Sequence, residues 1–185
     1  NHIMKLLICH RSYPGQFRWL LPEFERIGLE VVFLCKEKTN WALYKNCMVI
    51  ETSYECKSPE RDINRRPGEE FALDFIHEAT KLKNSGWNPQ TILAHTGWGV
   101  WRSNIVFPKA KLLVYFEWWY TKENIKYMGF NPINTMDTFE LVNHSTRQAI
   151  EVADSAFTPT TWQRSQLPIF LKGKVKIIED GFPVN

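Results

Sequence analysis

The chain has 185 residues, of which 44% are hydrophobic and 14% aromatic. This length accommodates one well-buried domain but not two ordinary ones, and the composition excludes a wholly disordered chain. The net charge of +3 is too small to indicate a nucleic-acid partner, because nucleic-acid binders usually carry a concentrated basic face.

The cysteines and the apolar runs indicate the compartment. The four cysteines lack the spacing of a metal site or a redox pair. Cys9 and Cys35 lie inside strand-like apolar runs, so we interpret them as core residues of a cytoplasmic protein in a reducing compartment. No uninterrupted apolar run approaches the roughly 18 residues of a membrane span. Residues 1–3 resemble the remnant of an expression tag, so the native start is expected at Met4.

From Met4 onward, strands are predicted to alternate with helices, which is typical of a parallel α/β sheet. Seven apolar runs are predicted as strands, at residues 5–9, 30–35, 47–50, 91–94, 111–116, 155–158 and 174–178. Helices are predicted at residues 14–27, 67–85, 101–107, 136–153 and 162–171. This order predicts a Rossmann-like three-layer α/β/α domain with a mainly parallel sheet of about seven strands.

Two long segments are predicted as loops. The segment 51–66 is highly charged and is interpreted as a solvated connection. The segment 117–136 contains Gly129 and Pro132 and is too long for a simple connection. Loops of that length usually carry function or form a lid. The aromatic and lysine-bearing part of this segment, 118–127, is also a candidate for peripheral contact with a membrane surface.

Polar residues stand where three of the predicted strands end. His10 follows the first strand, His95 follows the strand 91–94, and Glu117 follows the strand 111–116. If these strands are parallel neighbours, the three side chains converge on one rim, which is where ligands bind in open parallel sheets. A single histidine at a strand end is often only a hydrogen-bonding turn residue, so the convergence is what makes His95 a candidate functional residue.

Several common motifs are missing from the sequence. Only Gly15 follows the first strand where a dinucleotide fingerprint needs three glycines, and no Walker loop, GxSxG elbow or HExxH occurs. The segment Pro14-Gly15-Gln16 stands at a helix start, where it either approaches a phosphate through backbone N–H groups or forms a tight turn. Five aromatic residues follow strand ends: Trp98, Trp101, Trp118, Trp119 and Tyr120. About half of them are expected to contact a sugar ring or a lipid headgroup region, and the others to belong to the core.

Four blocks of sequence occur in order at the predicted strand ends. They read PGQFR at 14–18, HTGWG at 95–99, YFE at 115–117 and SAFTPTTWQRSQ at 155–166. Together they resemble the N-terminal domain of family-four glycosyltransferases with a GT-B fold, most closely a bacterial subgroup with PGQFR, HPGWG, YFE and SPTxWQRSQ-type blocks. The resemblance implies retaining transfer of a sugar from a nucleotide-sugar donor to a saccharide or lipid-linked acceptor. Residues 4–185 would then be the acceptor-side domain, and the donor-binding C-terminal domain would be absent from this chain.

The resemblance also implies roles for single residues. Gly15 and Gln16 match the loop that approaches the donor phosphates, and Thr96 stands where the subgroup has a proline. Glu117, where many relatives have a histidine near the reacting sugar, is expected to have a raised pKa if buried and to act as acceptor ligand or base. The expected site has catalytic Glu117 and His95, donor contacts at Gly15 and Gln16, and substrate contacts at His10, Gly97, Trp98, Gly99, Trp118 and Tyr120. No metal and no cofactor other than the donor is expected.

Two other interpretations stay open. One is a non-catalytic Rossmann-like module that binds carbohydrate or protein through its tryptophan-rich rim, and the other is epimerisation of a nucleotide sugar on a GT-B scaffold. The isolated domain is expected to be inactive, because the missing half would supply most of the leaving-group stabilisation. Since the chain ends four residues after Gly181, the reading frame is expected to continue past Asn185. The inner membrane face is the expected place of any peripheral contact.

Overall fold

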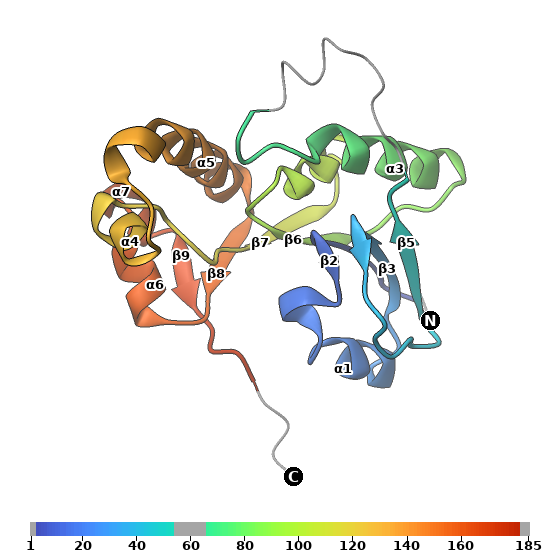
Figure 1. Ribbon diagram of the computed structural model, residues 1–185. Coiled ribbons are helices and arrows are strands. Elements are labelled where there is room, and N and C mark those ends of the chain that lie inside the picture. The colour runs from blue at the N-terminus through green and yellow to red at the C-terminus, as the bar shows by residue number, and fades with distance from the viewer. Residues whose placement is uncertain (1–2, 54–65, 182–185) are drawn as a thin grey trace.

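The computed structural model describes residues 3–53 and 66–181. A central parallel sheet has helices on both faces (Figure 1). Its seven strands lie in the order β5-β3-β1-β6-β7-β8-β9. They are β1 (Lys5–Cys9), β3 (Glu30–Cys35), β5 (Cys47–Glu51), β6 (Thr91–His95), β7 (Lys111–Tyr115), β8 (Ser155–Thr158) and β9 (Val175–Ile177). The predicted Rossmann-like α/β/α fold with about seven strands is therefore confirmed.

The order of the strands reverses beside β1. The chain first moves outward from β1 to β3 and β5, and then returns to the other side of β1 with β6 and β7. In register, Cys9 lies opposite Ala94, and His95 lies opposite Tyr115. The expectation that the three strands β1, β6 and β7 are parallel neighbours is confirmed, so their carboxyl ends share one edge at a topological switch point.

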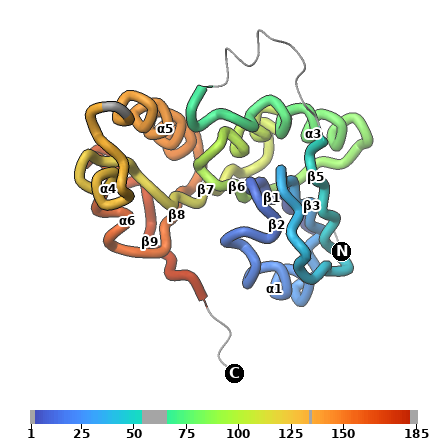
Figure 2. The backbone as a smooth tube through the Cα atoms, in the orientation of Figure 1, coloured from blue at the N-terminus to red at the C-terminus, as the bar shows by residue number. Residues whose placement is uncertain are grey.

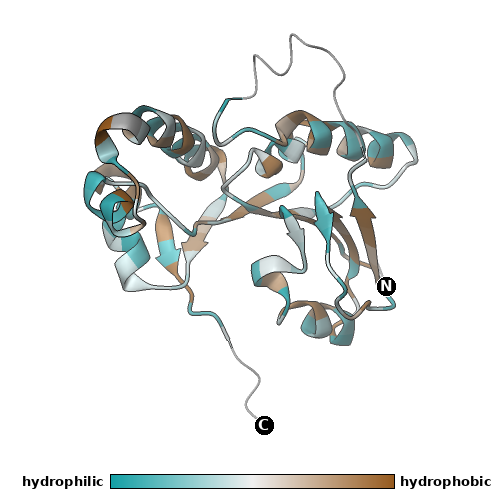
Figure 3. Ribbon diagram, viewed as in Figure 1, coloured by the Kyte–Doolittle hydropathy of each residue, from teal (hydrophilic) through white to brown (hydrophobic). Residues whose placement is uncertain are grey.

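The sheet separates two hydrophobic cores. On one face, α3 (Ala72–Asn84), the 3-10 helix η2 (Val100–Ile105), α5 (Pro132–Val152) and α7 (Ile169–Lys172) pack on the strands. On the other face, η1 (Gly15–Phe17) and α1 (Leu21–Arg26) do so. Cys9 belongs to the first core and Cys35 to the second, and both thiols are free and buried, as expected. Figure 3 shows the hydrophobic residues concentrated in the central strands.

Two predicted helices start differently in the structure. The expected helix 14–27 is divided into η1 and α1, and Ile27 is exposed. Pro22 lies at the start of α1 and cannot continue a helix from η1, because it lacks a backbone N–H. The helix expected from residue 67 begins at Ala72, since Gly68 has a left-handed φ of 87°. Phe75, Ala79 and Leu82 form a buried stripe on one side of this helix.

The prediction of a long loop over 117–136 is wrong. The segment contains α4 (Lys122–Tyr127) and the first turn of α5. Thr121 and Asn124 form a capping box at the start of α4, with hydrogen bonds of 3.2 and 2.9 Å in the two directions. Buried Ile125 attaches this helix to the domain. The T-x-x-N spacing therefore specifies a helix start that apolar periodicity does not reveal.

The remaining elements are short. Thr160 caps α6 (Thr161–Gln166), and the helix expected at 162–171 is interrupted at Pro168, where the chain turns into α7. The helix expected at 101–107 is instead the 3-10 helix η2, and two further two-residue strands, β2 (Ser12–Tyr13) and β4 (Glu37–Lys38), pair with one another. Most of the expected loop 51–66 lies outside the described residues. Among the described helices, none has both the length and the hydropathy that crossing a membrane requires.

The first and last parts of the domain lie near one another. Figure 2 shows α1 and the residues after β9 on the same side of the sheet. The residues between β1 and α1 and those from 178 to 181 line a common pocket. Segments from the two ends of the sequence therefore frame the carboxyl edge of the strands.

Candidate functional site

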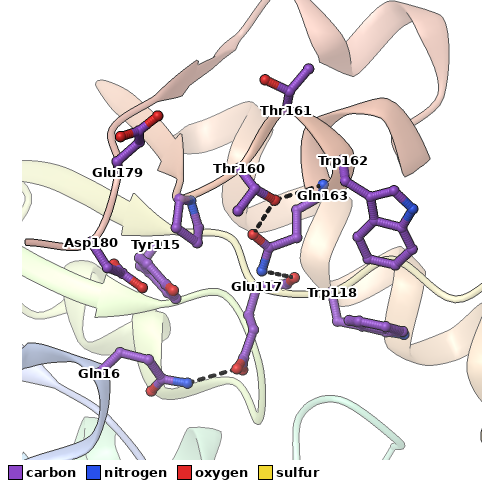
Figure 4. Close-up of a pocket in the computed structure, with 11 residues that line it drawn as sticks. Gln16, Tyr115, Glu117, Trp118, Thr160, Thr161, Trp162, Gln163, Glu179 and Asp180 are labelled. Carbon is purple, nitrogen blue, oxygen red and sulfur yellow. Dashed lines mark hydrogen bonds between the residues drawn. The ribbon is translucent and has the colours of Figure 1, made fainter.

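Four side chains at the carboxyl edge of the sheet form a hydrogen-bonded network. His10 directly follows β1, His95 is the last residue of β6, and Glu117 lies just after β7. The His95 ring contacts Glu117 Oε2 through Nε2 at 3.0 Å. Figure 4 shows the bond on the other side of this carboxylate, in which Gln16 Nε2 donates to Glu117 Oε1 at 2.8 Å. Gln16 Oε1 is also hydrogen-bonded to His10 Nε2. The structure thus brings together four of the residues expected at the site.

Both histidines are oriented by the backbone two residues further on. The Gly97 N–H donates to His95 Nδ1 at 2.8 Å, and His10 Nδ1 lies 3.0 Å from the Ser12 backbone nitrogen and 2.8 Å from the Ser12 carbonyl oxygen. A neutral ring whose Nδ1 accepts carries its proton on Nε2. With this tautomer, His95 donates directly to the Glu117 carboxylate. The amide oxygen of Gln16 can only accept a hydrogen bond, so His10 Nε2 donates to it. Two donors of the network, His95 Nε2–H and the Gln16 amide N–H, therefore point toward one carboxylate.

The donors decide the ionisation of Glu117. The hydrogen bond from His95 is the main cause of a lowered pKa for this carboxyl group, and its effect exceeds the opposing effect of burial. Gln16 lowers the pKa of Glu117 further. The expectation of a raised pKa is therefore wrong, because it considered the apolar neighbours and not the donors. In contrast, burial lowers the pKa of His10 to about 4, and His95 adds to this shift.

Trp98 forms the aromatic floor of the network. Its ring stacks on the ring of His95, with centroids 4.7 Å apart and an interplanar angle of 30°. His10 approaches both rings edge-on. Trp98 adopts a left-handed φ of 58°, which is a strained conformation for a bulky residue. The strained backbone directs the indole onto His95.

The expected glycines have mainly steric roles. A Cβ at Gly15 would lie 2.4 Å from the His10 ring, and one at Gly97 would lie 3.0 Å from His95 Nδ1. Both glycines therefore let the backbone pack against the network. Gly99 instead packs against Glu69 and Ala72, away from the network.

Tyr120, another expected substrate contact, also lies outside the network. Its ring stacks on Phe139 with centroids 4.3 Å apart, and its backbone N–H and C=O pair with the side chain of Asn143. Trp101 is buried in the core, and Trp119 is packed against it. Of the aromatic residues after β7, Trp118 is the one that lines a pocket beside the network.

Thr96 strengthens the loop after β6. Its backbone N–H donates to the Tyr115 carbonyl oxygen at 3.0 Å, and the residue is buried. A proline at this position has no N–H and could not make that bond. The departure from the proline of the resembling subgroup therefore adds a connection between the ends of β6 and β7.

Two pockets open beside the network. The first, here called the aromatic pocket, has a volume of about 840 Å³. It is lined by Gln16, Tyr115, Glu117, Trp118, Pro159, Thr160, Thr161, Trp162, Gln163, Glu179 and Asp180. The second, here called the loop pocket, has a volume of about 810 Å³ and lies between the residues after β1 and residues 178–181. Gln16, Tyr115, Glu179 and Asp180 line both pockets.

Sequence reasoning assigned no role to several lining residues. Asp180 lies shortly after β9, so the rule that polar residues at strand ends converge could have identified it. Trp162 and Gln163 belong to the fourth sequence block, which was noted without a role. Burial raises the pKa of Asp180, and the charge of Glu117 adds to this effect. Within residues 3–53 and 66–181, no three His, Cys, Asp or Glu side chains are grouped so that they could hold a metal ion.

Solved structures with this fold include a complex with UDP, a UDP-glucosyltransferase and a UDP-N-acetylglucosamine 2-epimerase. Os79 from O. sativa, solved in complex with UDP, is 11% identical, with a TM-score of 0.56 over 96% of this chain and 52% of its own. A UDP-glucosyltransferase from Polygonum tinctorium is 7% identical, with a TM-score of 0.51 over 100% of this chain and 53% of its own. A UDP-N-acetylglucosamine 2-epimerase is 11% identical, with a TM-score of 0.56 over 95% of this chain and 48% of its own. At this identity the likeness establishes the fold alone.

Comparison with families and curated proteins adds a second result. Residues 28–185 match the family described as the glycosyl transferase family 4 group. No curated protein matches the chain. The chain spans about half the length of the solved structures that it resembles.

Proposed function

The chain belongs to the glycosyl transferase family 4 group, and on this premise we propose that it is the acceptor-side domain of a retaining glycosyltransferase. The enzyme transfers a sugar from a nucleotide-sugar donor to a saccharide or lipid-linked acceptor. Its own C-terminal domain binds most of the donor. We place the protein in the cytoplasm, since the described cysteines are free thiols, with peripheral membrane contact if the acceptor is a lipid.

The observation that carries this proposal is the carboxylate network at the switch point. Glu117 receives donors from His95 and Gln16 and lines the aromatic pocket. Because its pKa is lowered, Glu117 is ionised and well suited to accept a hydrogen bond from an acceptor hydroxyl. A carboxylate with a lowered pKa is a weak base, so its proposed role is to orient the attacking oxygen rather than to remove its proton.

His95 supports Glu117 through the hydrogen bond from its Nε2–H to Oε2. Its ring is fixed by the Gly97 N–H and by the stacked Trp98 indole, so its Nε2–H has one direction. We assign it the role of holding the carboxylate in place and keeping it ionised. His10 holds the Gln16 amide in place through a hydrogen bond to Oε1. Because the pKa of His10 is about 4, its ring is neutral at physiological pH.

The donor is proposed to approach from the loop pocket. Gly15 lines this pocket next to the exposed side chain of Arg18. Backbone N–H groups and a guanidinium are common partners of phosphate oxygens. No metal is assigned to the reaction, and the residues of the missing domain would neutralise most of the leaving diphosphate. The single domain should therefore bind substrate without turning it over.

The test uses the full-length protein that contains this domain and a panel of nucleotide sugars. Nucleotide release and transfer to mono- and oligosaccharide acceptors are measured for the wild type and for Glu117→Gln and Glu140→Gln. Glu140 is an exposed residue of α5 that lines neither pocket, so its substitution is the matched control.

We expect transfer with retention, seen as an unchanged anomeric configuration by NMR. Glu117→Gln should lower kcat about 100-fold or more, because an oriented carboxylate is replaced by an amide. Full activity of Glu117→Gln, or absence of turnover with every donor, would sink the proposal.

A further inference from the structure

The aromatic pocket has two chemically different sides. Figure 4 shows the indoles of Trp118 and Trp162 on one side, and Tyr115, Glu179 and Asp180 on the other. Its volume of about 840 Å³ lies within the roughly 300–1,000 Å³ typical of small-molecule sites. The pocket therefore offers an apolar face and a row of polar groups across a space large enough for sugar rings.

The aromatic side presents a free indole surface. Half of Trp162 is exposed, and its ring centroid lies 5.2 Å from that of Trp118 with 50° between the planes. The two rings form a corner rather than a closed stack. Large aromatic faces bind the C–H faces of sugars through dispersion and apolar burial. An exposed tryptophan at the mouth of a pocket fits this use.

The backbone around Trp162 is held in place. Thr160 caps α6 by accepting the Gln163 N–H at 3.1 Å, and its hydroxyl donates to Gln163 Oε1 at 2.7 Å. The Gln163 amide in turn donates to the Glu117 backbone carbonyl at 3.0 Å. The wall that carries the indole is thus hydrogen-bonded to Glu117, the residue whose carboxylate is proposed to orient the attacking oxygen.

The polar side is acidic. The ionisable carboxyl groups that line the pocket are those of Glu117, Glu179 and Asp180. In the described part of the chain, no lysine or arginine lines it, whereas the loop pocket includes Arg18 and His10. Carboxylates accept hydrogen bonds from hydroxyl groups but repel phosphates and other carboxylates. The charge of the pocket therefore favours a neutral ligand over an anionic one.

From these two sides, we propose that the aromatic pocket is a subsite for an uncharged sugar ring of the acceptor, stacked on Trp162 and hydrogen-bonded to the carboxylates. Uronic acids and sugar phosphates are excluded from it. A lipid-linked acceptor must place its phosphates elsewhere. That this sugar belongs to the acceptor rests on the function proposed above, but the binding of a neutral sugar does not.

Binding is tested first on the 185-residue chain. Saturation-transfer NMR and calorimetry are run with the neutral probes cellotetraose, maltotetraose and chitotetraose, and with trigalacturonate as the anionic probe. The chain is compared with Trp162→Ala, Trp162→Phe and Trp41→Ala, the last being a partly exposed tryptophan outside both pockets. At least one neutral probe should bind, Trp162→Ala should weaken it about tenfold, and Trp162→Phe should retain most of it.

The acidic side is tested by Asp180→Asn. This change should improve the affinity for trigalacturonate relative to the neutral probe, because one repelling charge is removed. If no neutral probe binds, if Trp162→Ala and Trp41→Ala behave alike, or if trigalacturonate binds the unaltered chain best, the subsite assignment is overturned.

Transfer by the full-length protein separates the two proposals. With both correct, Trp162→Ala raises the KM for the acceptor about tenfold, whereas the control Trp41→Ala, outside both pockets, leaves this KM unchanged. If the full-length protein turns over and Trp162→Ala leaves its acceptor KM unchanged, the subsite is overturned and the glycosyltransferase function stands. Trp162-dependent binding without turnover by any donor overturns the function and leaves a neutral-sugar site.

Discussion

Replacement of Gly15 by alanine tests how tightly the first loop packs on the network. Gly15 has a left-handed φ of 54°, and a Cβ there would lie 2.4 Å from two atoms of the His10 ring. His10 is buried and is held by Ser12 and Gln16, so it cannot move aside without breaking hydrogen bonds. Gly28 is a matched control, because its φ of 74° is also left-handed and a Cβ there would meet no atom within 4 Å.

The expected magnitudes follow from these two geometries. A left-handed alanine costs about 1–2 kcal/mol at either position, and the reduced entropy of the unfolded chain returns about 0.4–1 kcal/mol. Gly28→Ala should therefore lower the free energy of unfolding by about 1 kcal/mol. Gly15→Ala must also displace a packed ring, which adds about 1–3 kcal/mol. The total for Gly15→Ala is about 2–4 kcal/mol.

The measurement is urea unfolding of both variants, followed by circular dichroism. In a thermal melt of the same variants, each kcal/mol of lost stability would lower the melting temperature by about 2–4 °C for a domain of this size. The NMR signals of the His10 ring should also shift in Gly15→Ala and stay unchanged in Gly28→Ala. Equal losses of stability in the two variants would refute the close packing of Gly15 on His10.

Two further predictions concern stability. Burial lowers the pKa of His10 from 6.5 to about 4. Between these two pH values the unfolded chain therefore binds a proton at His10 that the folded chain does not bind. The free energy of unfolding should fall by about 3 kcal/mol as the pH drops from 6.5 to 4, and unfolding of His10→Gln at several pH values should lack this slope. Glu69 forms a two-point ion pair with Arg102, at 2.6 and 2.8 Å, on partly buried side chains. Glu69→Gln should cost about 1–3 kcal/mol in urea unfolding, and a loss no larger than that of the exposed-site change Glu123→Gln would contradict this role.

The sheet could be predicted because its signal is local. Each strand is a short apolar run between polar or glycine-rich segments, and parallel strands buried on both faces need no other pattern. Helix starts were predicted less well, since they depend on single residues. Pro22 divides the first helix, and Thr121 with Asn124 starts α4, where periodicity alone indicated a loop.

The site was predictable only as a location. The rule about strand ends brought His10, His95 and Glu117 to one edge, and the structure agrees. The bond between Gln16 and Glu117, which are 101 positions apart, has no sequence signal. The direction of the Glu117 pKa shift depends on that bond and on the His95 tautomer, so composition around the residue could not supply it.

Glu117 connects the proposed reactive edge to the proposed acceptor subsite. Its carboxylate is held by His95 and Gln16, and its backbone carbonyl accepts a hydrogen bond from Gln163. Gln163 directly follows Trp162 on α6, so the distance between the indole and the carboxylate is set within this one domain. A site whose parts are already fixed loses little entropy when a ligand binds. Neutral-sugar binding should therefore be measurable on this chain alone, whereas the proposed transfer would also need a donor-binding domain.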